Sequence, residues 1–471
     1  MKNKLLAHFF SSGLQAIAVQ VLGAVFFYIT SLYLDKSGFG IINWSNAVAL
    51  FLTTLLSFGM EQVMVRRVAA STSSQWPAAA YFFHAIAGSV ITSAILFTIG
   101  YIIKDNTEFK YLPWFFTAQA IMYIGSPLRQ YLNAREKFTP YGIISVISNL
   151  LKILLVYMVV KTKVLTIPTV ITILLICAAL EVAALLFYVL RKTAFTFRFK
   201  LIAYKKLVKE SLPQFAAVIF DTSLSRMDWI LLGLISTAAA TADYSFAYKA
   251  YEIARLPVII IAPVILPRFA RLLAYENRID AAKTLFVNQV FAIQMFVAAC
   301  IPLCMNIVWA SWVGTLTQGK YGASNSLQLL ILSLCVPLQF IINLLWTLCF
   351  SRRMYKAVLY NTIASAIINL VLNLILIPKY GGTGAAIAYL ASNIAQVIVY
   401  FLISRQKILQ FSLTPLVTFS ALSIGAYYAG RYLTHTILMH LTVSLCIYVL
   451  LSVLLRFINK KHLVVLRTFL R

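Results

Sequence analysis

Apolar runs of about 20 residues recur along the whole chain, and this repetition constrains the fold more than any other feature of the sequence. A run of that length is enough for one α-helix to cross the hydrocarbon core of a bilayer. Of the 471 residues, 61% are hydrophobic and 11% are charged, whereas a soluble domain has about 25% charged residues. The sequence therefore predicts an all-α, polytopic membrane protein.

We expect about fourteen transmembrane helices joined by short connections. Spans one to six resemble spans seven to twelve in hydropathy, and similar basic segments (Arg135-Glu-Lys-Phe138 and Arg352-Arg-Met-Tyr355) precede spans five and eleven. A shift of six spans preserves orientation, so we expect two parallel six-helix repeats around a central cavity, plus two C-terminal helices. The predicted spans are 12–34, 41–59, 78–103, 111–132, 141–160, 167–190, 213–235, 244–266, 284–309, 327–350, 357–377, 382–404, 413–433 and 436–457.

The predicted organisation has three parts. Residues 1–200 form an N-terminal six-helix lobe, residues 201–410 form a C-terminal six-helix lobe, and residues 411–471 add two transmembrane helices and a basic tail. The longest connection runs from about Arg191 to Leu212, and its Lys and Arg residues indicate a cytosolic linker between the lobes.

The placement of the basic residues predicts the orientation of the chain. A net charge of +27 is compatible with nucleic-acid binding. However, the Lys and Arg residues lie mostly in every second connection between spans, as the positive-inside rule requires of cytosolic segments. We therefore expect no nucleic-acid partner, and we expect both termini to lie in the cytosol.

All six cysteines fall inside apolar spans, which indicates buried packing rather than disulfides or metal ligation. Cys300 and Cys304 share one helix face, but no His or carboxylate accompanies them to complete a metal site. We expect neither a metal nor a cofactor.

Spans seven and eight contain six ionisable residues at membrane depth. Such a group costs several kcal/mol unless it faces protein or water, so these spans indicate a polar space within the membrane. Polar positions repeat there at helical spacing. The set in span seven is Asp221, Ser225 and Asp228, with Arg226 on another face. Span eight has two adjacent stripes, formed by Tyr244, Tyr248, Tyr251 and Arg255 and by Ser245, Lys249 and Glu252.

Two interpretations of these residues remain open. In the functional one, the basic side chains bind an anionic group of a substrate, with guanidinium groups suited to bidentate contact, and the tyrosines contact the rest of it. In the structural one, an aspartate of span seven pairs with a basic residue across spans and the tyrosines pack as core. The candidate substrate-binding residues are Arg226, Lys249, Arg255, Lys152, Asp221, Asp228, Tyr248 and Tyr251.

Buried carboxylates are candidates for coupling transport to an ion gradient, because a carboxylate in a membrane cavity can exchange protons or bind Na⁺. The candidates are Glu181, Glu61 and Glu252. Lys152 lies well inside span five, where it either lines the cavity, snorkels to an interface or pairs with Glu181. His84 is expected to be a hydrogen-bonded core histidine.

Two features of the second repeat have ordinary structural explanations. Asn369 and Asn373 stack at i, i+4 in span eleven and are expected to form interhelical hydrogen bonds. The segment from Pro378 to Gly384 predicts a tight turn on the outer side, because its glycines permit positive φ and close helix approach.

Two stretches of the sequence carry a family resemblance. The more specific stretch is Asn369-Leu-Val-Leu-Asn-Leu-Ile-Leu-Ile-Pro378-Lys-Tyr-Gly-Gly-Thr-Gly-Ala385. The looser one comprises Ser211-Leu-Pro-Gln, Asp228-Trp-Ile-Leu-Leu-Gly233, Tyr244-Ser-Phe-Ala-Tyr-Lys249 and Leu266-Pro-Arg-Phe-Ala-Arg271. Together with the arrangement of spans, they resemble Wzx-type polysaccharide flippases of the multidrug/oligosaccharidyl-lipid/polysaccharide (MOP) exporter superfamily.

The resemblance implies a bacterial protein of the cytoplasmic membrane that moves undecaprenyl-pyrophosphate-linked oligosaccharides across it by alternating access, for O-antigen, capsule or exopolysaccharide biosynthesis. Expected partners are this glycan, membrane lipids and the polysaccharide polymerase and glycosyltransferases of the same pathway. The alternative within the superfamily is a cation-coupled multidrug exporter, but that function favours a cavity rich in carboxylates. A glycosyl polymerase or ligase is disfavoured because such enzymes use a substantial outer loop, and here no predicted outer loop exceeds about 20 residues. The chain is therefore not expected to be an enzyme.

Overall fold

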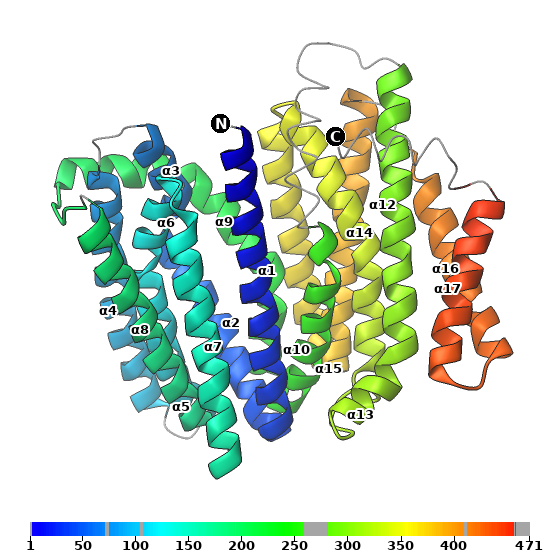
Figure 1. The fold of residues 1–471 in the computed structure, drawn as a ribbon, viewed down its shortest axis with the longest axis horizontal. Coiled ribbons are helices and arrows are strands. Elements are labelled where there is room, and N and C mark those ends of the chain that lie inside the picture. Colours follow the sequence, from blue (N-terminus) through cyan, green and yellow to red (C-terminus); the bar gives the residue numbers. More distant parts are fainter. Residues whose placement is uncertain are drawn as a thin grey trace. The chain divides into compact units, whose positions relative to one another are not determined.

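The computed structural model of the protein describes residues 2–70, 75–103, 107–193, 195–258, 281–408, 412–455 and 457. The secondary structure in these ranges is helical, with no strand (Figure 1). Contacts divide the chain into two compact units, Met1–Ala242 and Asp243–Arg471. The prediction of an all-α polytopic membrane protein is confirmed.

The first unit is built from α1 (Lys2–Tyr33), α2 (Lys36–Ser57), α3 (Met60–Ala70), α4 (Trp76–Ile102), α5 (Thr107–Ile124), α6 (Ser126–Ala134), α7 (Phe138–Thr162), α8 (Ile167–Lys192) and α9 (Leu201–Ile235). The chain continues with α10 (Ala238–Ala254), α12 (Ala281–Val308), a π-helical turn η1 (Trp309–Val313), α13 (Gly314–Leu316), α14 (Ser326–Ser351), α15 (Tyr355–Lys407), α16 (Thr414–Leu433) and α17 (Ile437–Leu454).

These helices cover at least part of every predicted span. Eight of the described helices are long and apolar enough to cross a membrane by length and composition alone. This number is smaller than the number of predicted spans partly because α15 counts once, although it contains spans eleven and twelve. Gly381 separates these two spans with non-helical angles of φ 53° and ψ −131°, at the turn that the glycine-rich sequence predicts.

The lobe boundaries at residues 200 and 410 remain a prediction. They were derived from a repeat in the sequence, whereas the two compact units are defined by contacts, so the units do not test the boundaries. The seventh span, α9, packs against α2, α3 and α4 within the first unit. The Leu266–Arg271 part of the quoted resemblance and most of the basic tail after residue 455 lie outside the described residues.

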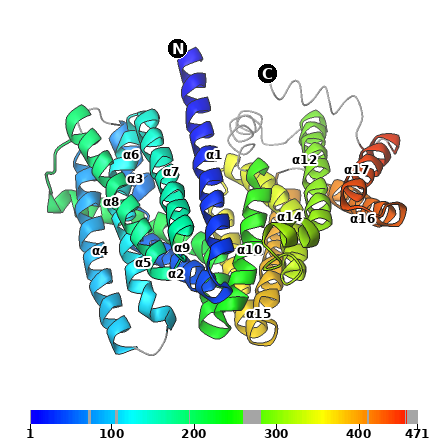
Figure 2. The same cartoon turned by 60° about the horizontal axis from the view of Figure 1, so that its bottom comes forward.

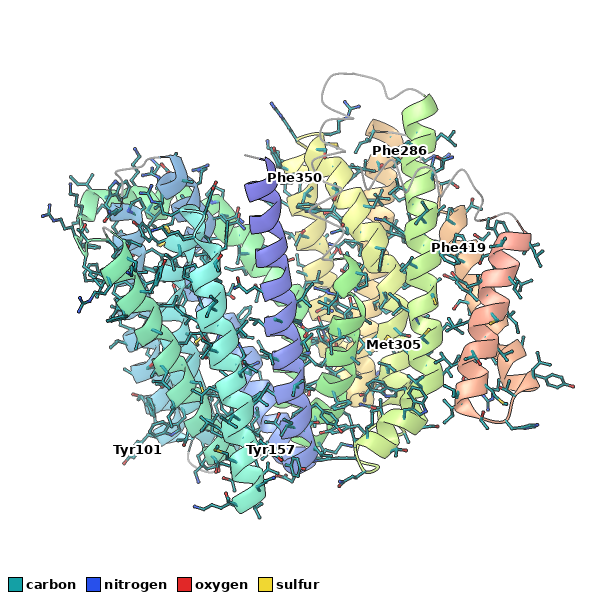
Figure 3. All side chains as sticks on the ribbon, viewed as in Figure 1. Tyr101, Tyr157, Phe286, Met305, Phe350 and Phe419 are labelled. Atoms are coloured by element: carbon teal, nitrogen blue, oxygen red, sulfur yellow. The ribbon has the colours of Figure 1, made fainter. Side chains whose placement is uncertain are left out.

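The last two helices, α16 and α17, pack against each other and against α12 (Figure 2). The Tyr448 hydroxyl donates a hydrogen bond to the Phe296 carbonyl oxygen at 2.7 Å, and the Phe296 and Phe419 rings meet at 5.7 Å. Away from these contacts, many side chains that face outward are apolar. Figure 3 shows two of them, Tyr101 and Tyr157, toward the same end of α4 and α7, which is where aromatic residues accumulate at a membrane interface.

Two predicted spans of the first unit are interrupted helices. Span two breaks between α2 and α3, where Phe58 and Gly59 both have positive φ (49° and 65°). Span four breaks between α5 and α6 at Gly125. The two breaks lie side by side, because the Ser126 hydroxyl at the start of α6 donates a 2.6 Å hydrogen bond to Glu61 in the first turn of α3.

The helices beyond these breaks share one apolar core, on the side that the Lys and Arg distribution assigns to the cytosol. We call this part the cytosolic cap, after the orientation predicted from the sequence, and it consists of α3, α6, the beginning of α4, the extended segment 195–200 and residues 201–212 of α9. Its fully buried core side chains include Met60, Met64, Val68, Tyr81, Leu128, Leu132 and Leu207.

The extended segment Phe195-Thr-Phe-Arg-Phe-Lys200 is attached to the cap by alternate residues. Successive side chains of an extended chain point to opposite sides, so the three phenylalanines share one side. They contact the rings of Tyr131, Phe82 and Phe83 in turn, at centroid distances of 5.1, 5.0 and 5.7 Å. The polar residues between them are largely exposed. This alternation fixes the path from α8 to α9.

An ion pair ties the beginning of α9 to α3. The Arg67 guanidinium donates two hydrogen bonds to the Glu210 carboxylate, one from Nε at 2.7 Å, and it lies over the Trp76 ring at 5.2 Å. Arg66 lies 3.6 Å from the same carboxylate but is largely exposed. Because the hydrogen-bonded Arg67 stabilises the charged form, the pKa of Glu210 is lower than its ordinary value.

The lowered pKa of Glu210 makes a prediction about acid stability. A carboxylate whose pKa is depressed in the folded state stabilises the protein above its unfolded pKa, and the contribution disappears as the pH falls through the folded pKa. We therefore expect wild type to have a higher melting temperature than Glu210→Gln at pH 7, and the difference to start shrinking below the ordinary glutamate pKa of about 4.3 and to vanish once the pH has fallen through the lower folded pKa. Thermal unfolding in detergent over this pH range measures the difference. A gap that persists unchanged into acid would contradict the assignment.

Candidate functional site

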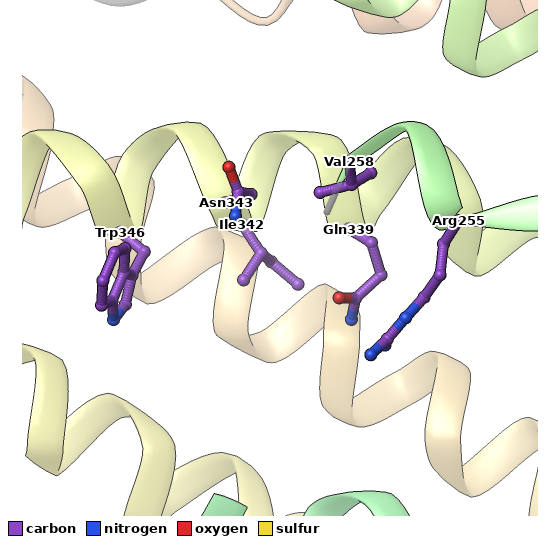
Figure 4. A pocket seen from close by; sticks show the side chains of 6 residues that line it. All are labelled: Arg255, Val258, Gln339, Ile342, Asn343 and Trp346. Carbon is purple, nitrogen blue, oxygen red and sulfur yellow. The ribbon is translucent and has the colours of Figure 1, made fainter. Parts of the chain in front are cut away.

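A cavity of about 170 Å³ in the second unit lies between α14 and the end of α10. Gln339, Asn343 and Trp346 line it from one face of α14, since they are spaced at i, i+4 and i+7. Figure 4 shows the polar ends of Arg255 and Gln339 approaching each other from the two elements. The remaining lining residues are Val258 and Ile342.

Arg255 carries a positive charge into this cavity. Its guanidinium carbon lies 5.7 Å from the centre of the Tyr251 ring, an attractive but weak cation–π contact. Within the described part of the chain, no carboxylate lies within ion-pair distance of Arg255. An arginine at membrane depth usually has a paired charge or faces water. The cavity is therefore suited to an anion that accepts hydrogen bonds from a guanidinium and from the Gln339 and Asn343 amides.

The tyrosines of span eight form the wall behind Arg255. Tyr248 and Tyr251 are fully buried and contact the Tyr389 ring from α15 at 5.6 and 5.7 Å. The hydroxyls of Tyr251 and Tyr389 are 3.2 Å apart. In this conformation their ring faces are covered by protein, so they support the arginine. A direct role in sugar binding remains a prediction.

Lys249 and Glu252 form an ion pair on the same helix, with Nζ and Oε2 2.9 Å apart. At the i, i+3 spacing, such pairs are neighbours on one helix face. Each charge is thereby neutralised locally, which leaves Arg255 as the stronger anion-binding candidate of this helix.

The candidates on α9 belong to the first unit. Asp228 is fully buried, whereas Asp221, two turns earlier, is exposed. The Arg226 guanidinium lies over the Trp229 ring at 5.3 Å. The predicted stripe of Asp221, Ser225 and Asp228 therefore passes from an exposed surface into the interior.

A second polar cavity, of about 200 Å³, lies beside the helix breaks of the first unit. Glu61 lines it and accepts hydrogen bonds from Ser126 at 2.6 Å and from the Tyr81 hydroxyl at 3.2 Å. Arg129 also lines it from α6. The other lining residues are Thr53, Thr54, Ser57, Gln119, Tyr123, Ser126, Val218 and Thr222.

Glu181 lies on α8 in contact with the same arginine. Its Oε1 accepts a 3.0 Å hydrogen bond from Ser145 and lies 3.9 Å from Arg129. The other carboxylate oxygen is buried without a hydrogen-bond partner. Of the three readings of Lys152, pairing with Glu181 is not observed among the described residues, because Arg129 occupies that role.

The expectation for His84 is confirmed. Its Nδ1 lies 2.9 Å from the Tyr204 hydroxyl and its Nε2 lies 2.6 Å from the Leu56 carbonyl oxygen. A carbonyl only accepts, so Nε2 carries the proton and, in the neutral ring, Nδ1 accepts from Tyr204. Asn373 donates a 3.0 Å hydrogen bond to Asn369, one turn earlier on the same helix, rather than the predicted bond between helices.

The polar residues that line these cavities without being candidates from the sequence include Gln339, Asn343 and Arg129. Gln339 and Asn343 lie at i and i+4 in the apolar span 327–350. This spacing of two polar residues is the sequence signal that could have identified them. Arg129 lies close to the end of predicted span four at residue 132, where a basic residue is expected at the membrane interface. The break at Gly125 starts a new helix instead and places Arg129 beside the cavity.

Comparison with known proteins places the chain in a family. A family model described as "Polysaccharide biosynthesis protein" matches residues 5–273. The chain belongs to the polysaccharide biosynthesis protein family. No curated protein sequence matches it. This family agrees with the resemblance to polysaccharide flippases drawn from the sequence, and one of the structural relatives below is described as a member of the MOP superfamily.

Solved structures show that the fold of this polysaccharide biosynthesis protein is shared with flippases and exporters. It is similar to the inward closed conformation of the lipid II flippase MurJ, with a TM-score of 0.76 at 14% identity over 94% of this chain and 99% of that chain. It is also similar to an inward-facing multidrug resistance MATE family transporter of the MOP superfamily, with a TM-score of 0.68 at 14% identity over 83% and 94% of the two chains. The Vibrio cholerae MATE transporter VcmN D35N mutant gives 0.58 at 13% identity over 87% and 98%. The chain thus has the multi-span helical fold of these flippases and exporters.

Proposed function

We propose that the protein is a flippase for undecaprenyl-pyrophosphate-linked oligosaccharides in the bacterial cytoplasmic membrane, with both termini in the cytosol. The observation that carries the proposal is Arg255, a guanidinium in a membrane cavity without a carboxylate partner among the described residues. A pyrophosphate head group supplies the missing negative charge in a geometry that a guanidinium binds well. The lipid tail remains in the bilayer while the head group crosses.

The family description supports a role in polysaccharide biosynthesis, and the fold supports alternating access between two six-helix repeats. The polar lining beside Arg255 suits a hydrated, hydrogen-bonding cargo, because Gln339 and Asn343 provide amide donors and acceptors. The glycosyltransferases and polymerase of the same pathway are the partners that this function requires. Glu61 and Glu181 remain the proposed ion-coupling groups, while Glu252 is already paired with Lys249.

Reconstitution into liposomes tests the substrate class directly. Wild-type protein is offered three probes: a prenyl-pyrophosphate-linked glycan, the same glycan on a prenyl monophosphate, and a cationic dye. We expect protein-dependent translocation of the first, slower translocation of the second and none of the third. Transport of the dye alone would favour the multidrug exporter that shares this fold and would overturn the proposal.

A further inference from the structure

The two ends of the membrane helix pair α2–α9 are held by contacts of different kinds. At the end near the start of α2, the packing is tight and apolar. The Trp44 Nε1–H donates a 3.0 Å hydrogen bond to the Ile230 carbonyl oxygen. A Cβ added to Gly233 would lie 1.9 Å from the Trp44 ring, and one added to Gly40 would lie 1.8 Å from the Ala238 carbonyl oxygen. No side chain fits at either glycine unless the helices separate.

At the other end, α9 meets the break between α2 and α3. Phe58 and Phe215 stack with ring centroids 4.2 Å apart. A Cβ added to Gly59 would lie 2.7 Å from the Phe215 backbone nitrogen and 3.1 Å from the Gln214 Cβ. The break in span two therefore lies directly against residues 214–215 of α9.

That part of α9 also contains Pro213. Proline has no N–H, so the carbonyl of Lys209 lacks its helical hydrogen bond, and the helix is weakened at this turn. The interruption at Phe58–Gly59 and the proline inside the continuous helix α9 thus lie at the same level in neighbouring helices. The break at Gly125 is adjacent, as the bond from Ser126 to Glu61 shows.

Before Pro213, α9 is firmly attached to the cytosolic cap. Figure 1 shows its beginning crossing the end of the bundle that contains α3 and α4. Three separate contacts hold this part: the Phe195–Lys200 segment, the hydrogen bond between Tyr204 and His84, and the ion pair of Glu210 with Arg67. Leu207 is fully buried in the cap core between them. All three contacts lie on the N-terminal side of the proline.

After Pro213, α9 borders empty space. Val218 and Thr222 line the 200 Å³ cavity of the first unit together with Ser57 and Glu61. The stretch of α9 just after the proline therefore borders a cavity, whereas the stretch before it contributes Leu207 to the packed cap core. Such a difference in packing is what separates a moving element from a fixed one.

We propose that Phe58, Gly59 and Pro213 form a hinge at which the membrane part of α9 pivots on a fixed cytosolic cap. The inference rests on the proposed transport function at one point. In that function, α9 is the first helix of the second repeat, and movement of this repeat against the first would open the path for the cargo. The apolar contact of Trp44 and Gly233 closes the far end of the α2–α9 pair. It separates when the helix pivots, while Glu210 stays bound to Arg67.

Spin-label distances in the full protein test the hinge. The six native cysteines are replaced, and labels are attached at Ala69 and Lys206 within the cap, or at Ser37 and Thr237 at the far end, all four of which are exposed. The protein is held in lipid nanodiscs. In Gly233→Ala, the added Cβ clashes with Trp44, so we expect the population with a long Ser37–Thr237 distance to rise about fivefold. The Ala69–Lys206 distance is expected to stay unchanged.

Two further variants complete the test. Trp44→Phe removes the hydrogen bond to Ile230 without adding bulk, and is expected to shift the far-end distance in the same direction if Gly233→Ala fails to fold. Pro213→Ala restores the helical hydrogen bond, and is expected to reduce the long-distance population of Gly233→Ala at least threefold while raising the melting temperature. Lengthening of the cap distance together with the far-end distance would overturn the hinge.

The distance measurements need no substrate, so their failure and that of the proposed function are distinguishable. If the far-end distance responds as expected but no prenyl-pyrophosphate-linked glycan is moved, the hinge stands and the substrate is wrong. If the glycan is moved but the far-end distance is unaffected by both Gly233→Ala and Trp44→Phe, the function stands and the hinge is wrong.

Discussion

Replacing Arg255 by alanine is expected to lower the rate of glycan translocation about 100-fold. Two charge-assisted hydrogen bonds to a phosphate contribute roughly 3 kcal/mol together, and each 1.4 kcal/mol corresponds to about a factor of ten. Arg255→Lys is expected to retain part of the rate, because an ammonium keeps the charge but not the bidentate geometry. Initial rates in liposomes measure both effects.

The matched control is Arg431→Ala, which removes an exposed arginine from α16, outside the two repeats. Its transport rate is expected to equal that of wild type. Equal rates for Arg255→Ala and wild type, with comparable amounts of folded protein, would show that Arg255 does not bind the cargo. The family assignment does not depend on that result.

The second large effect is expected at Arg129. Glu181 is almost fully buried, and one of its oxygens already lacks a hydrogen bond. Arg129→Ala removes the one positive group within ion-pair distance of this carboxylate in the described structure. Breaking a buried pair from one side is costly because a charge remains uncompensated, so we expect a loss of about 3 kcal/mol. Thermal unfolding in detergent should show a melting temperature several degrees lower.

A double variant separates this effect from simple loss of packing. Glu181→Gln alone leaves a neutral group that still accepts from Ser145, so it is expected to be milder than Arg129→Ala. Adding Glu181→Gln to Arg129→Ala should recover most of the lost stability, since no unpaired charge remains. Lys152→Ala serves as the control and is expected to have little effect. Additive losses in the double variant would contradict the pairing.

The fold could be predicted because membrane helices leave a strong signal. Every backbone polar group must be satisfied inside the hydrocarbon core, so an apolar run of sufficient length has few structural options. The helix breaks were harder to predict from the sequence. Phe58-Gly59 and Gly125 are common residues in membrane helices, and their positive φ or changed direction depends on neighbouring helices that the local sequence does not specify.

The candidate site could be predicted only in part. Arg255 stood out because a charge at membrane depth needs an explanation, and it does line a cavity. Lys249 and Glu252 stood out for the same reason, but their spacing also allows the local pair that the structure shows. Three-dimensional packing decides which of several cations pairs with a carboxylate. The sequence therefore offered Lys152 as a possible partner of Glu181, whereas the structure places Arg129 beside it.

The exposed residues at the start of α9 have a consequence for the surrounding lipid. Leu201 and Ile202 are 57% and 86% exposed, and Lys205, Lys206 and Lys209 follow on the same short segment. Apolar side chains beside lysines are the combination that inserts into the head-group region of anionic phospholipids. Anionic phospholipids are therefore expected to bind this surface of the cap and to hold it at the head-group region.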